Sequence, residues 1–399
     1  MAMIDEKLLK ISKKYLFSTI EKKRDELRKT LGENQLVDLG VGDISLPLAP
    51  SIVEGLKEGA HEMERSVIGY GPYEGYAFLR EAIVQSEYSH VDVGLDEIFV
   101  SEGINGDLCG MQELFSPSAR VGIIDPAYPV YLTLNILSGR ETIVTLPLKE
   151  ENGYMPKPPK EGLDLVFLTS PGNPIGIAQT RENLQEWVNW AKQYNAIIFF
   201  DAAYASFIQS KEVPKTIYEI EGARDVAIEF RSFSKSSGFT GVRLGYTVVP
   251  KNLFLKSAEG KDYSINALWM NRQSTKTNGI SYPIQRAGLA ALTPQGKAEC
   301  MAQVKTYLAG AKKMKETLQN MGYTVVGGVD SPYLWWKVPY GSSWEWFDKL
   351  IEECHLISIP GEGFGKWGEG YVRLSGFVNP ATCEKAILHL KRLGVLSAV

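Results

Sequence analysis

The sequence has few of the residues that carry metal, disulfide or triad chemistry. It contains only 4 cysteines and 4 histidines among 399 residues. No Cys-x-x-Cys pair occurs, so we expect reduced thiols in a cytoplasm-like compartment. The histidines show neither metal-ligand spacing nor a nucleophile motif. We therefore expect no metal, and the metal-hydrolase and serine-hydrolase classes lack the residues they need.

Charge of one sign and long hydrophobic runs are scarce as well. The net charge is −4 and no long basic tract is present, which argues against a nucleic-acid partner. The first 30 residues carry charges throughout and show no apolar core of a secretory signal. The most apolar run, Ala196–Phe200, stops at Asp201, far short of a membrane span. We expect a soluble, cytoplasmic protein with an ample core and no membrane partner.

Short apolar runs alternate with amphipathic stretches between about residues 96 and 250. The clearest helical pattern covers Arg181–Tyr194. β-rich runs without polar alternation, separated by helices, predict a mainly parallel sheet with both faces buried, and thus an α/β domain. The expected strands are Glu97–Val100, Val121–Asp125, Thr142–Leu146, Leu165–Ser170, Ala196–Asp201, Val226–Arg231 and Leu244–Val249.

The pattern changes beyond about residue 285, where a smaller α+β domain is predicted. Its last helix is expected to open at Asn379-Pro380, a good N-cap and first-turn pair. The preceding elements are a helix over Glu299–Met321, strands over Tyr323–Val326 and Tyr333–Val338, a helix near Trp344–Cys354, and strands near Ile357–Ile359 and Tyr371–Leu374. We expect an N-terminal arm over residues 1–45 that joins the small domain, a large domain over 46–285, and a small domain over 286–399.

The segment Ser232–Gly245 has the most informative pattern. It places Lys235 between small hydroxyl residues, continues with a glycine-containing turn, and has Arg243 eight positions later (243 − 235 = 8). This layout is expected where a lysine amine condenses with the aldehyde of pyridoxal phosphate while hydroxyls and an arginine hold the phosphate. A desolvated position would also lower the pKa of Lys235. The alternative is a surface lysine in a Ser/Gly loop.

Other expected strand ends carry suitable chemistry, since the carboxyl ends of parallel strands face the ligand crevice. Asp201 is either the partner of a pyridinium nitrogen or a strand-end cap, and Tyr204 is placed to donate to the ring oxygen. Asn173 follows another strand in a Pro/Gly turn, and Tyr128 follows a third, as a stacking ring or a packed loop aromatic.

Three weaker patterns complete the set. Ser101–Gly106 lies between a strand and a helix, where free N–H groups hold phosphate. Arg373, in a strand-like context, is either a carboxylate-binding residue or an exposed arginine. The glycine-rich Gly361–Gly365 is expected to be a turn, and Trp335-Trp336 to be core.

In their order along the chain, these residues resemble those of fold-type I aminotransferases, most closely the LL-diaminopimelate aminotransferase family. The resemblance spans nearly the whole chain. It rests on Lys14–Phe17, Asp125–Pro129, Phe200–Tyr204, Ser232–Lys235, Gly238–Gly245, Asn278-Gly279, Pro332–Trp335 and Pro360–Gly365.

The resemblance implies a pyridoxal-phosphate enzyme with Lys235 as the cofactor-binding lysine and proton shuttle. It implies that Asp201 meets the ring nitrogen, that Asn173 and Tyr204 meet the ring oxygen, and that Tyr128 stacks on the ring. The phosphate is expected to bind Ser232, Ser234, Arg243 and the backbone of Ile104 and Asn105. The substrate is expected to contact Arg373, Gly42, Tyr15, Asn105, Tyr128 and Asn173. The family forms homodimers, so Tyr70 and Asn278 are expected to reach in from the partner chain.

Two departures concern the far end of the substrate. The family pattern Ser-Asp-Gly-Ala-Lys is replaced by Ser101-Glu-Gly-Ile-Asn105, and Gly-Tyr-Gly-x-Glu-Gln-Gly by Gly69-Tyr-Gly-Pro-Tyr-Glu-Gly75. The lost lysine and displaced glutamate predict an altered distal site, because an unpaired buried charge costs several kcal/mol.

The predicted activity is therefore transfer of an α-amino group between an amino acid and a 2-oxo acid such as 2-oxoglutarate, with small-molecule substrates. One alternative is a donor without a distal carboxylate, such as a lysine-like amino acid. Another is a lyase or decarboxylase on the same fold, because those enzymes share the lysine. A non-catalytic regulator is disfavoured by the presence of Lys235, Asp201 and Arg243 together.

Overall fold

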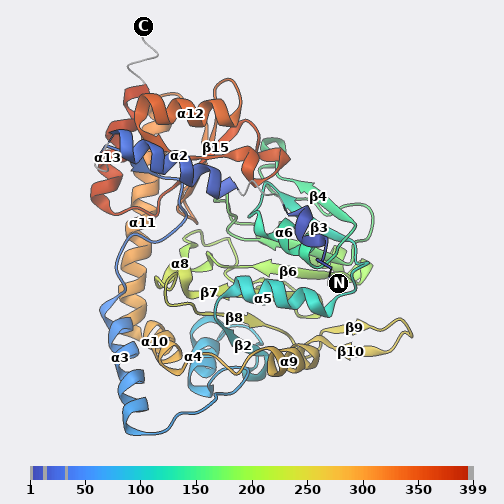
Figure 1. Cartoon of the computed structure of the whole chain (residues 1–399). Coiled ribbons are helices and arrows are strands. Elements are labelled where there is room, and N and C mark those ends of the chain that lie inside the picture. The colour runs from blue at the N-terminus through green and yellow to red at the C-terminus, as the bar shows by residue number, and fades with distance from the viewer. Residues whose placement is uncertain (1–2, 12–15, 32–34, 394–399) are drawn as a thin grey trace.

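The computed structural model describes residues 3–11, 16–31 and 35–393. A seven-stranded sheet forms its centre, in the order β2-β8-β7-β6-β5-β3-β4 (Figure 1). The pairings from β4 to β7 are parallel, whereas β8 is antiparallel to both β7 and β2. The predicted mainly parallel sheet is confirmed. Its strands are β2 (Ile98–Ser101), β3 (Val121–Asp125), β4 (Ile143–Pro147), β5 (Leu165–Thr169), β6 (Ile197–Asp201), β7 (Ala227–Ser232) and β8 (Gly245–Val248).

The antiparallel β8 decides where the lysine segment lies. A parallel neighbour would need a long crossover, but an antiparallel one allows a short return at the same end of the sheet. The chain therefore turns back directly after β7 through the short helix α8 (Phe233–Ser236). This return places Lys235 at the carboxyl end of β7.

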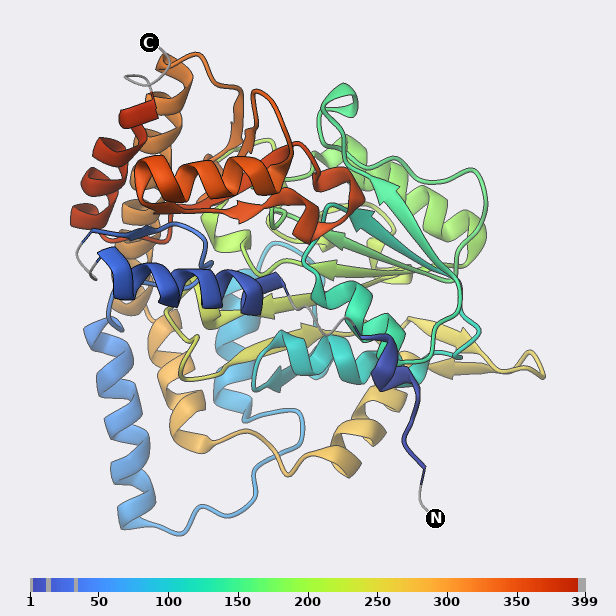
Figure 2. The ribbon, with the colours of Figure 1, turned by 45° about the horizontal axis from the view of Figure 1, so that its top comes forward.

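Helices cover both faces of the central sheet. Helix α7 (Arg181–Tyr194) has its predicted bounds, because Thr180 accepts a hydrogen bond from Asn183 N and Asn195 ends the helix in the left-handed region. Figure 2 shows α5 in front of the sheet and α7 behind it. The other helices of this part are α3 (Pro50–Arg65), α4 (Ala77–Glu87), α5 (Ile104–Met111), α6 (Val130–Leu137), α9 (Ile265–Lys276) and α10 (Tyr282–Leu292).

A second, four-stranded antiparallel sheet has the order β11-β12-β15-β14. The predicted single strand near Ile357–Ile359 is wrong, because β13 (Leu356–Ile357) pairs with β1 (Val37–Asp38) while β14 (Ile359–Pro360) pairs with β15. The remaining elements here are β11 (Val325–Gly327), β12 (Tyr333–Lys337), β15 (Tyr371–Ser375), α11 (Pro294–Asn320), α12 (Ser343–Cys354) and α13 (Pro380–Leu390). Helix α13 begins after the predicted Asn379 cap, which accepts a hydrogen bond from Thr382 N.

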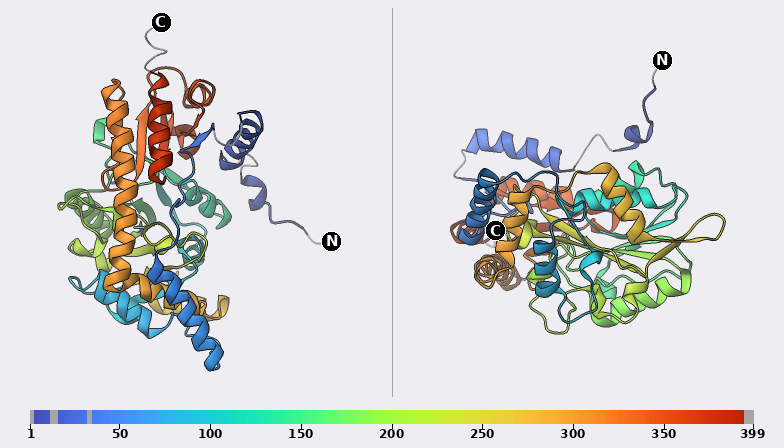
Figure 3. Two further views of the ribbon diagram at one scale, coloured as in Figure 1. Left: turned by 90° about the vertical axis from the view of Figure 1, so that its left-hand side faces the viewer. Right: turned by 90° about the horizontal axis from the view of Figure 1, so that it is seen from below.

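Helix α11 runs along one side of the molecule and connects the regions of the two sheets (Figure 3). Buried side chains surround each sheet, and the predicted core pair Trp335 and Trp336 is 1% and 0% exposed. A third buried cluster joins the two parts through Tyr204, Tyr307, Tyr333 and Phe377. The domain boundaries at residues 45 and 285 stay a prediction, although the β1–β13 pairing ties the N-terminal segment to the second sheet.

The remaining elements lie at the periphery. They are α1 (Lys7–Lys10), α2 (Leu16–Leu31) and the hairpin strands β9 (Phe254–Lys256) and β10 (Asp262–Ser264). In the part of the chain that the structure describes, no helix is long and apolar enough to cross a membrane.

Candidate active site

A cavity of about 370 Å³, here called the catalytic pocket, lies at the carboxyl ends of the central strands. Tyr333 of β12 and Arg373 of β15 form part of its wall from the second sheet. Twelve of the predicted site residues line it: Gly42, Ile104, Asn105, Tyr128, Asn173, Asp201, Tyr204, Ser232, Ser234, Lys235, Arg243 and Arg373.

Three predicted residues are not among those that line the catalytic pocket. Tyr15 lies outside the described residues. Tyr70 is 87% exposed, and Asn278 is exposed on a neighbouring loop. The two loops touch, because a Cβ atom on Gly279 would lie 3.0 Å from the carbonyl oxygen of Gly71. Tyr70 and Asn278 therefore belong to one exposed surface, and their contact with a partner chain stays a prediction.

The Lys235 amine lies in the catalytic pocket rather than on the surface. Ser232 caps α8 by accepting a hydrogen bond from Ser234 N at 3.1 Å, and Lys235 Nζ donates to the carbonyl oxygen of Gly42. Burial lowers the pKa of Lys235 to about 8, and the cations of Arg373 and Arg243 act in the same direction. An amine with this pKa is partly neutral near physiological pH, as a nucleophile or proton acceptor requires.

An anion cradle lies beside Lys235. Arg243 Nη1 is 3.4 Å from Ser234 Oγ and donates to the carbonyl oxygen of Thr240 at 3.1 Å. Helix α5 begins at Ile104 directly after Gly103, whose side chain cannot cap it, so first-turn N–H groups face the catalytic pocket. Hydroxyls, a guanidinium and a helix N-terminus together suit a phosphate dianion.

Gly103 is required for this approach of α5 to Arg243. It has φ 114°, and a Cβ atom at this position would lie 2.4 Å from Arg243 Nη2. Only glycine combines that backbone conformation with so close a neighbour. The sequence pattern indicated a phosphate site at residues 101–106, but the contact with Arg243 requires the folded chain.

The Asp201 carboxylate is buried at the end of β6. Its Oδ2 accepts a hydrogen bond from the Tyr131 hydroxyl at 2.6 Å, and its Oδ1 accepts one from Ala203 N at 3.0 Å. Burial raises the pKa of Asp201, and the two hydrogen bonds oppose that rise. Asp201 thus caps the end of its strand through the hydrogen bond from Ala203 N, and it also lines the catalytic pocket.

Sequence reasoning missed Tyr131, which approaches Asp201 from α6. Tyr128 and Tyr131 are three residues apart, with Tyr128 just before the start of α6, and their rings meet edge to face with centroids 5.8 Å apart. That spacing is the signal that points to Tyr131. Tyr333, expected only as a strand residue, also lines the catalytic pocket, and its hydroxyl lies 2.8 Å from the Tyr204 hydroxyl.

Arg373 is 1% exposed, so the alternative of an exposed strand arginine is wrong. Its Nη1 donates to Asn173 Oδ1 at 2.7 Å and its Nη2 to the carbonyl oxygen of Gly40 at 2.6 Å. The guanidinium carbon lies 4.5 Å from the ring centroid of Tyr333. Burial lowers the pKa of Arg373. The planar fork is held for a carboxylate in the catalytic pocket.

Of the two altered positions expected at the far end of the substrate, one lines the catalytic pocket and the other does not. Asn105 is exposed and lines the catalytic pocket. Glu74 does not line it and forms an ion pair with Arg80 at 3.4 Å. Among the described residues, no group of three or more His, Cys, Asp or Glu side chains is placed to hold a metal ion.

The chain matches a known family. The family model of aminotransferase class I and II matches residues 34–390. The chain belongs to this family. The aminotransferase is 44% identical over 401 residues to an LL-diaminopimelate aminotransferase of Methanosphaera stadtmanae, with 97% of each chain covered. It is 44% identical over 404 residues to that of Desulfotalea psychrophila, with 98% of this chain and 99% of the relative covered.

Solved structures agree with this assignment. The structure of L,L-diaminopimelate aminotransferase from Chlamydomonas reinhardtii has a TM-score of 0.92 and 37% identity, with 98% of each chain covered. The predicted fold-type I fold and aminotransferase function are confirmed. Members of this family are pyridoxal-phosphate enzymes that act on small molecules.

Proposed function

We propose that the aminotransferase binds pyridoxal phosphate in the catalytic pocket and transfers an α-amino group from LL-diaminopimelate to a 2-oxo acid such as 2-oxoglutarate. The observation that carries this proposal is the convergence of Lys235, Asp201, Arg243 and Arg373 on one cavity. The choice of donor rests on the two curated relatives, each of which is an LL-diaminopimelate aminotransferase at 44% identity.

The donor groups of the pocket fit pyridoxal phosphate. Arg243, Ser232, Ser234 and the N-terminus of α5 suit its phosphate, since the absent Cβ of Gly103 leaves Arg243 room against this helix. Asp201 is buried in this pocket and would keep a pyridinium nitrogen protonated, while Tyr128 would stack on the ring and Asn173 and Tyr204 would meet the ring oxygen. When bound, the cofactor supplies the electron sink that makes the donor's Cα proton acidic.

The residues of the chain then position the donor and move its proton. Arg373 binds the donor α-carboxylate through its planar fork, with the Gly42 backbone beside it. Lys235 would hold the cofactor at its aldehyde, and once the donor amine has displaced it, the free Nζ would accept and return the donor's Cα proton, which its pKa of about 8 permits near neutrality. Tyr131 keeps Asp201 charged by donating to it.

The enzyme acts as a cytoplasmic homodimer in this proposal, with Tyr70 and Asn278 completing the partner's pocket. Their location on one exposed surface supports this arrangement. The four free cysteines support a reducing compartment. Light scattering over a dilution series tests the dimer, and a monomer at all concentrations would contradict it.

A second donor class is favoured by one observation. Asn105 provides a neutral side chain at the pocket wall, where a cation would pair with a distal carboxylate. A donor without that carboxylate, such as lysine, would then react as well as or better than LL-diaminopimelate. LL-diaminopimelate would remain the faster donor if another cation of the protein pairs with its distal carboxylate.

A single-turnover experiment tests the proposal and distinguishes the donors. The holoenzyme is mixed with LL-diaminopimelate, lysine or glutamate, without a 2-oxo acid, and the cofactor absorbance is followed. We expect rapid conversion to the amino form of the cofactor with LL-diaminopimelate and none in the Lys235→Ala variant. Faster conversion with lysine would replace the donor, and release of ammonia or carbon dioxide would overturn the proposed transfer reaction.

A further inference from the structure

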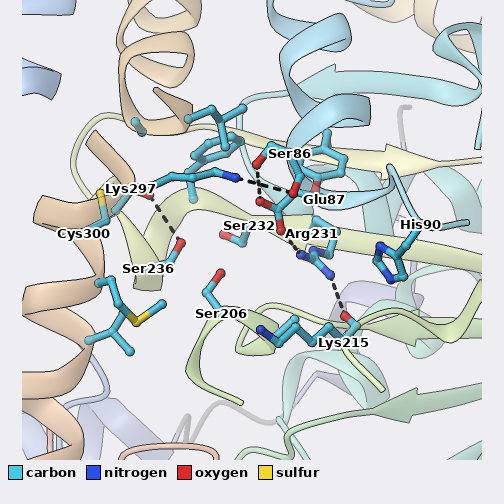
Figure 4. Close-up of a pocket in the computed structure, with 18 residues that line it drawn as sticks. Ser86, Glu87, His90, Ser206, Lys215, Arg231, Ser232, Ser236, Lys297 and Cys300 are labelled. Atoms are coloured by element: carbon cyan, nitrogen blue, oxygen red, sulfur yellow. Dashed lines mark hydrogen bonds and ion pairs between the residues drawn. The ribbon is translucent and has the colours of Figure 1, made fainter. Parts of the chain in front are cut away.

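A second cavity of about 380 Å³, here called the rear cavity and drawn in Figure 4, is lined by residues of α8, as the catalytic pocket is. Phe233, Ser236 and Ser237 line the rear cavity, whereas Ser234 and Lys235 line the catalytic pocket. Helix α8 is therefore a partition one helix thick between two cavities of nearly equal volume. The chemistry of transamination described above uses only one of them.

The rear cavity is positively charged in a protein whose net charge is −4. Its wall carries Lys215, Arg231 and Lys297 against one carboxylate, Glu87. Arg231 pairs with Glu87 at 2.8 Å and with the buried Glu229, which does not line the cavity, at 3.5 Å, so the positive charge of the wall comes from the two lysines. A net positive, partly enclosed cavity concentrates small anions.

The two lysines remain available to a ligand. Among the described residues, Lys297 Nζ contacts the carbonyl oxygen of Ser86 at 3.5 Å, and the charges of Lys297 and Lys215 help to lower the pKa of Glu87. Lys215 Nζ has no ion pair or hydrogen bond within the ranges that the structure describes, and Figure 4 shows its side chain extending into the cavity. These two ammonium groups form the anion-binding side of the rear cavity.

The rest of the wall is apolar. Phe233 of α8, Leu292 at the end of α10, and Met301 and Val304 of α11 line it. A cavity that combines an apolar wall with a few convergent charged groups is the usual form of a small-molecule site. The wall suits a ligand with an apolar body and an anionic head.

Ser232 connects the rear cavity to the chemistry, because it lines both cavities. Its Oγ accepts the hydrogen bond from Ser234 N that caps α8. We propose that the rear cavity binds a small carboxylate with an apolar body, and that its occupancy shifts α8 and with it Lys235. A ligand against Phe233 and Ser236 presses on the same four-residue helix that carries the lysine.

Calorimetry on the holoenzyme tests the binding site, with 3-phenylpropionate and its uncharged amide as the two probes. We expect the acid to bind at least roughly tenfold more tightly than the amide. The double variant Lys215→Gln, Lys297→Gln should remove that preference, and Met301→Trp should weaken both probes by filling the cavity. Lys211→Gln, an exposed lysine outside the cavity, is the matched control.

The Arg373→Gln variant tests whether the probe binds the catalytic pocket instead. If 3-phenylpropionate no longer binds Arg373→Gln but still binds the double lysine variant, it occupies the catalytic pocket, and the proposal is overturned. Equal affinity for acid and amide would also overturn it, because the ammonium groups would then contribute nothing.

Turnover measured with and without the acid tests the effect on Lys235. We expect kcat to change by roughly twofold or more in the wild type and to stay unchanged in the double lysine variant. A change in KM alone that persists in the double variant indicates competition at the catalytic pocket and contradicts the coupling. Binding with no change in kcat supports the site and overturns its effect on α8.

Discussion

The Tyr131 hydroxyl donates a 2.6 Å hydrogen bond to the Asp201 carboxylate, and so connects α6 to the end of β6 inside the catalytic pocket. Both groups are buried. Burial raises the pKa of Asp201, and this hydrogen bond is the larger of the two interactions that oppose the rise. Tyr131 is thus a positioning residue that keeps Asp201 charged.

We expect Tyr131→Phe to move the acid limb of the kcat/KM profile to higher pH and to lower kcat/KM roughly tenfold. A hydrogen bond to a charged acceptor contributes about 1.5–3 kcal/mol, and its loss favours protonated Asp201. Steady-state kinetics across pH measures the shift. Tyr154→Phe, whose hydroxyl contacts Tyr371 outside the catalytic pocket, should leave the profile unchanged. An unchanged acid limb in Tyr131→Phe would contradict this role.

The contact between Gly103 and Arg243 makes a second prediction. Gly103→Ala introduces a Cβ atom 2.4 Å from Arg243 Nη2 at a residue with φ 114°. We expect pyridoxal phosphate to bind roughly 10- to 100-fold more weakly, which corresponds to about 1.4–3 kcal/mol of strain and displacement. Fluorescence titration of the apoenzyme measures the affinity.

Gly106→Ala is the matched control for Gly103→Ala, because Gly106 lies in the first turn of α5, three residues after Gly103, and its Cβ atom would meet nothing within 4 Å. The control should bind the cofactor like the wild type. Equal affinities of the two variants would show that the close approach of α5 to Arg243 does not shape the phosphate site.

Arg373→Lys tests the fork that holds the donor. A lysine keeps the charge but cannot reproduce the paired contacts with Asn173 and Gly40 or the bidentate grip on a carboxylate. We expect kcat/KM for the amino donor to fall by roughly 10²–10³, or about 3–4 kcal/mol. Cofactor affinity, measured by the same titration, should change less than roughly threefold. An equal loss of cofactor affinity would instead indicate a general structural role.

The sequence predicted the residues whose location follows from strand direction. Asn173 lies in the loop that follows β5, and Asp201 is the last residue of β6. Parallel strands bring such positions to one edge of a sheet. Lys235 joins them because it follows β7. Amphipathic spacing likewise predicted α7 with its observed bounds.

Other features depend on contacts between distant segments and lack a local signal. Tyr333 reaches the catalytic pocket from the second sheet, and the close approach of Gly103 to Arg243 joins positions 140 residues apart (243 − 103 = 140). The division between β13 and β14 also depends on their pairing partners, because β13 pairs with β1 whereas β14 pairs with β15. No periodicity in one segment encodes which other segment will pair with it.

A buried carboxylate that takes no part in the proposed chemistry provides the last prediction. Asp107 is 3% exposed in α5, and its Oδ2 accepts hydrogen bonds from Ser101 Oγ at 2.5 Å and Thr247 Oγ1 at 2.8 Å. These contacts attach α5 to β2 and β8. Burial raises the pKa of Asp107 from 3.8 to about 6, against the effect of both hydrogen bonds.

Because the folded pKa lies above the unfolded value, the Asp107 contribution to stability is complete below about pH 4 and is lost as the pH rises through about 6. The loss amounts to about 3 kcal/mol. In Asp107→Asn the amide oxygen accepts the same two hydrogen bonds without a charge. We therefore expect the variant to gain about 3 kcal/mol over the wild type between about pH 4 and 7, measured by urea unfolding. Asp262→Asn, on an exposed hairpin, should show no such gain. A parallel pH dependence in the wild type and Asp107→Asn would mean that Asp107 does not titrate in this range.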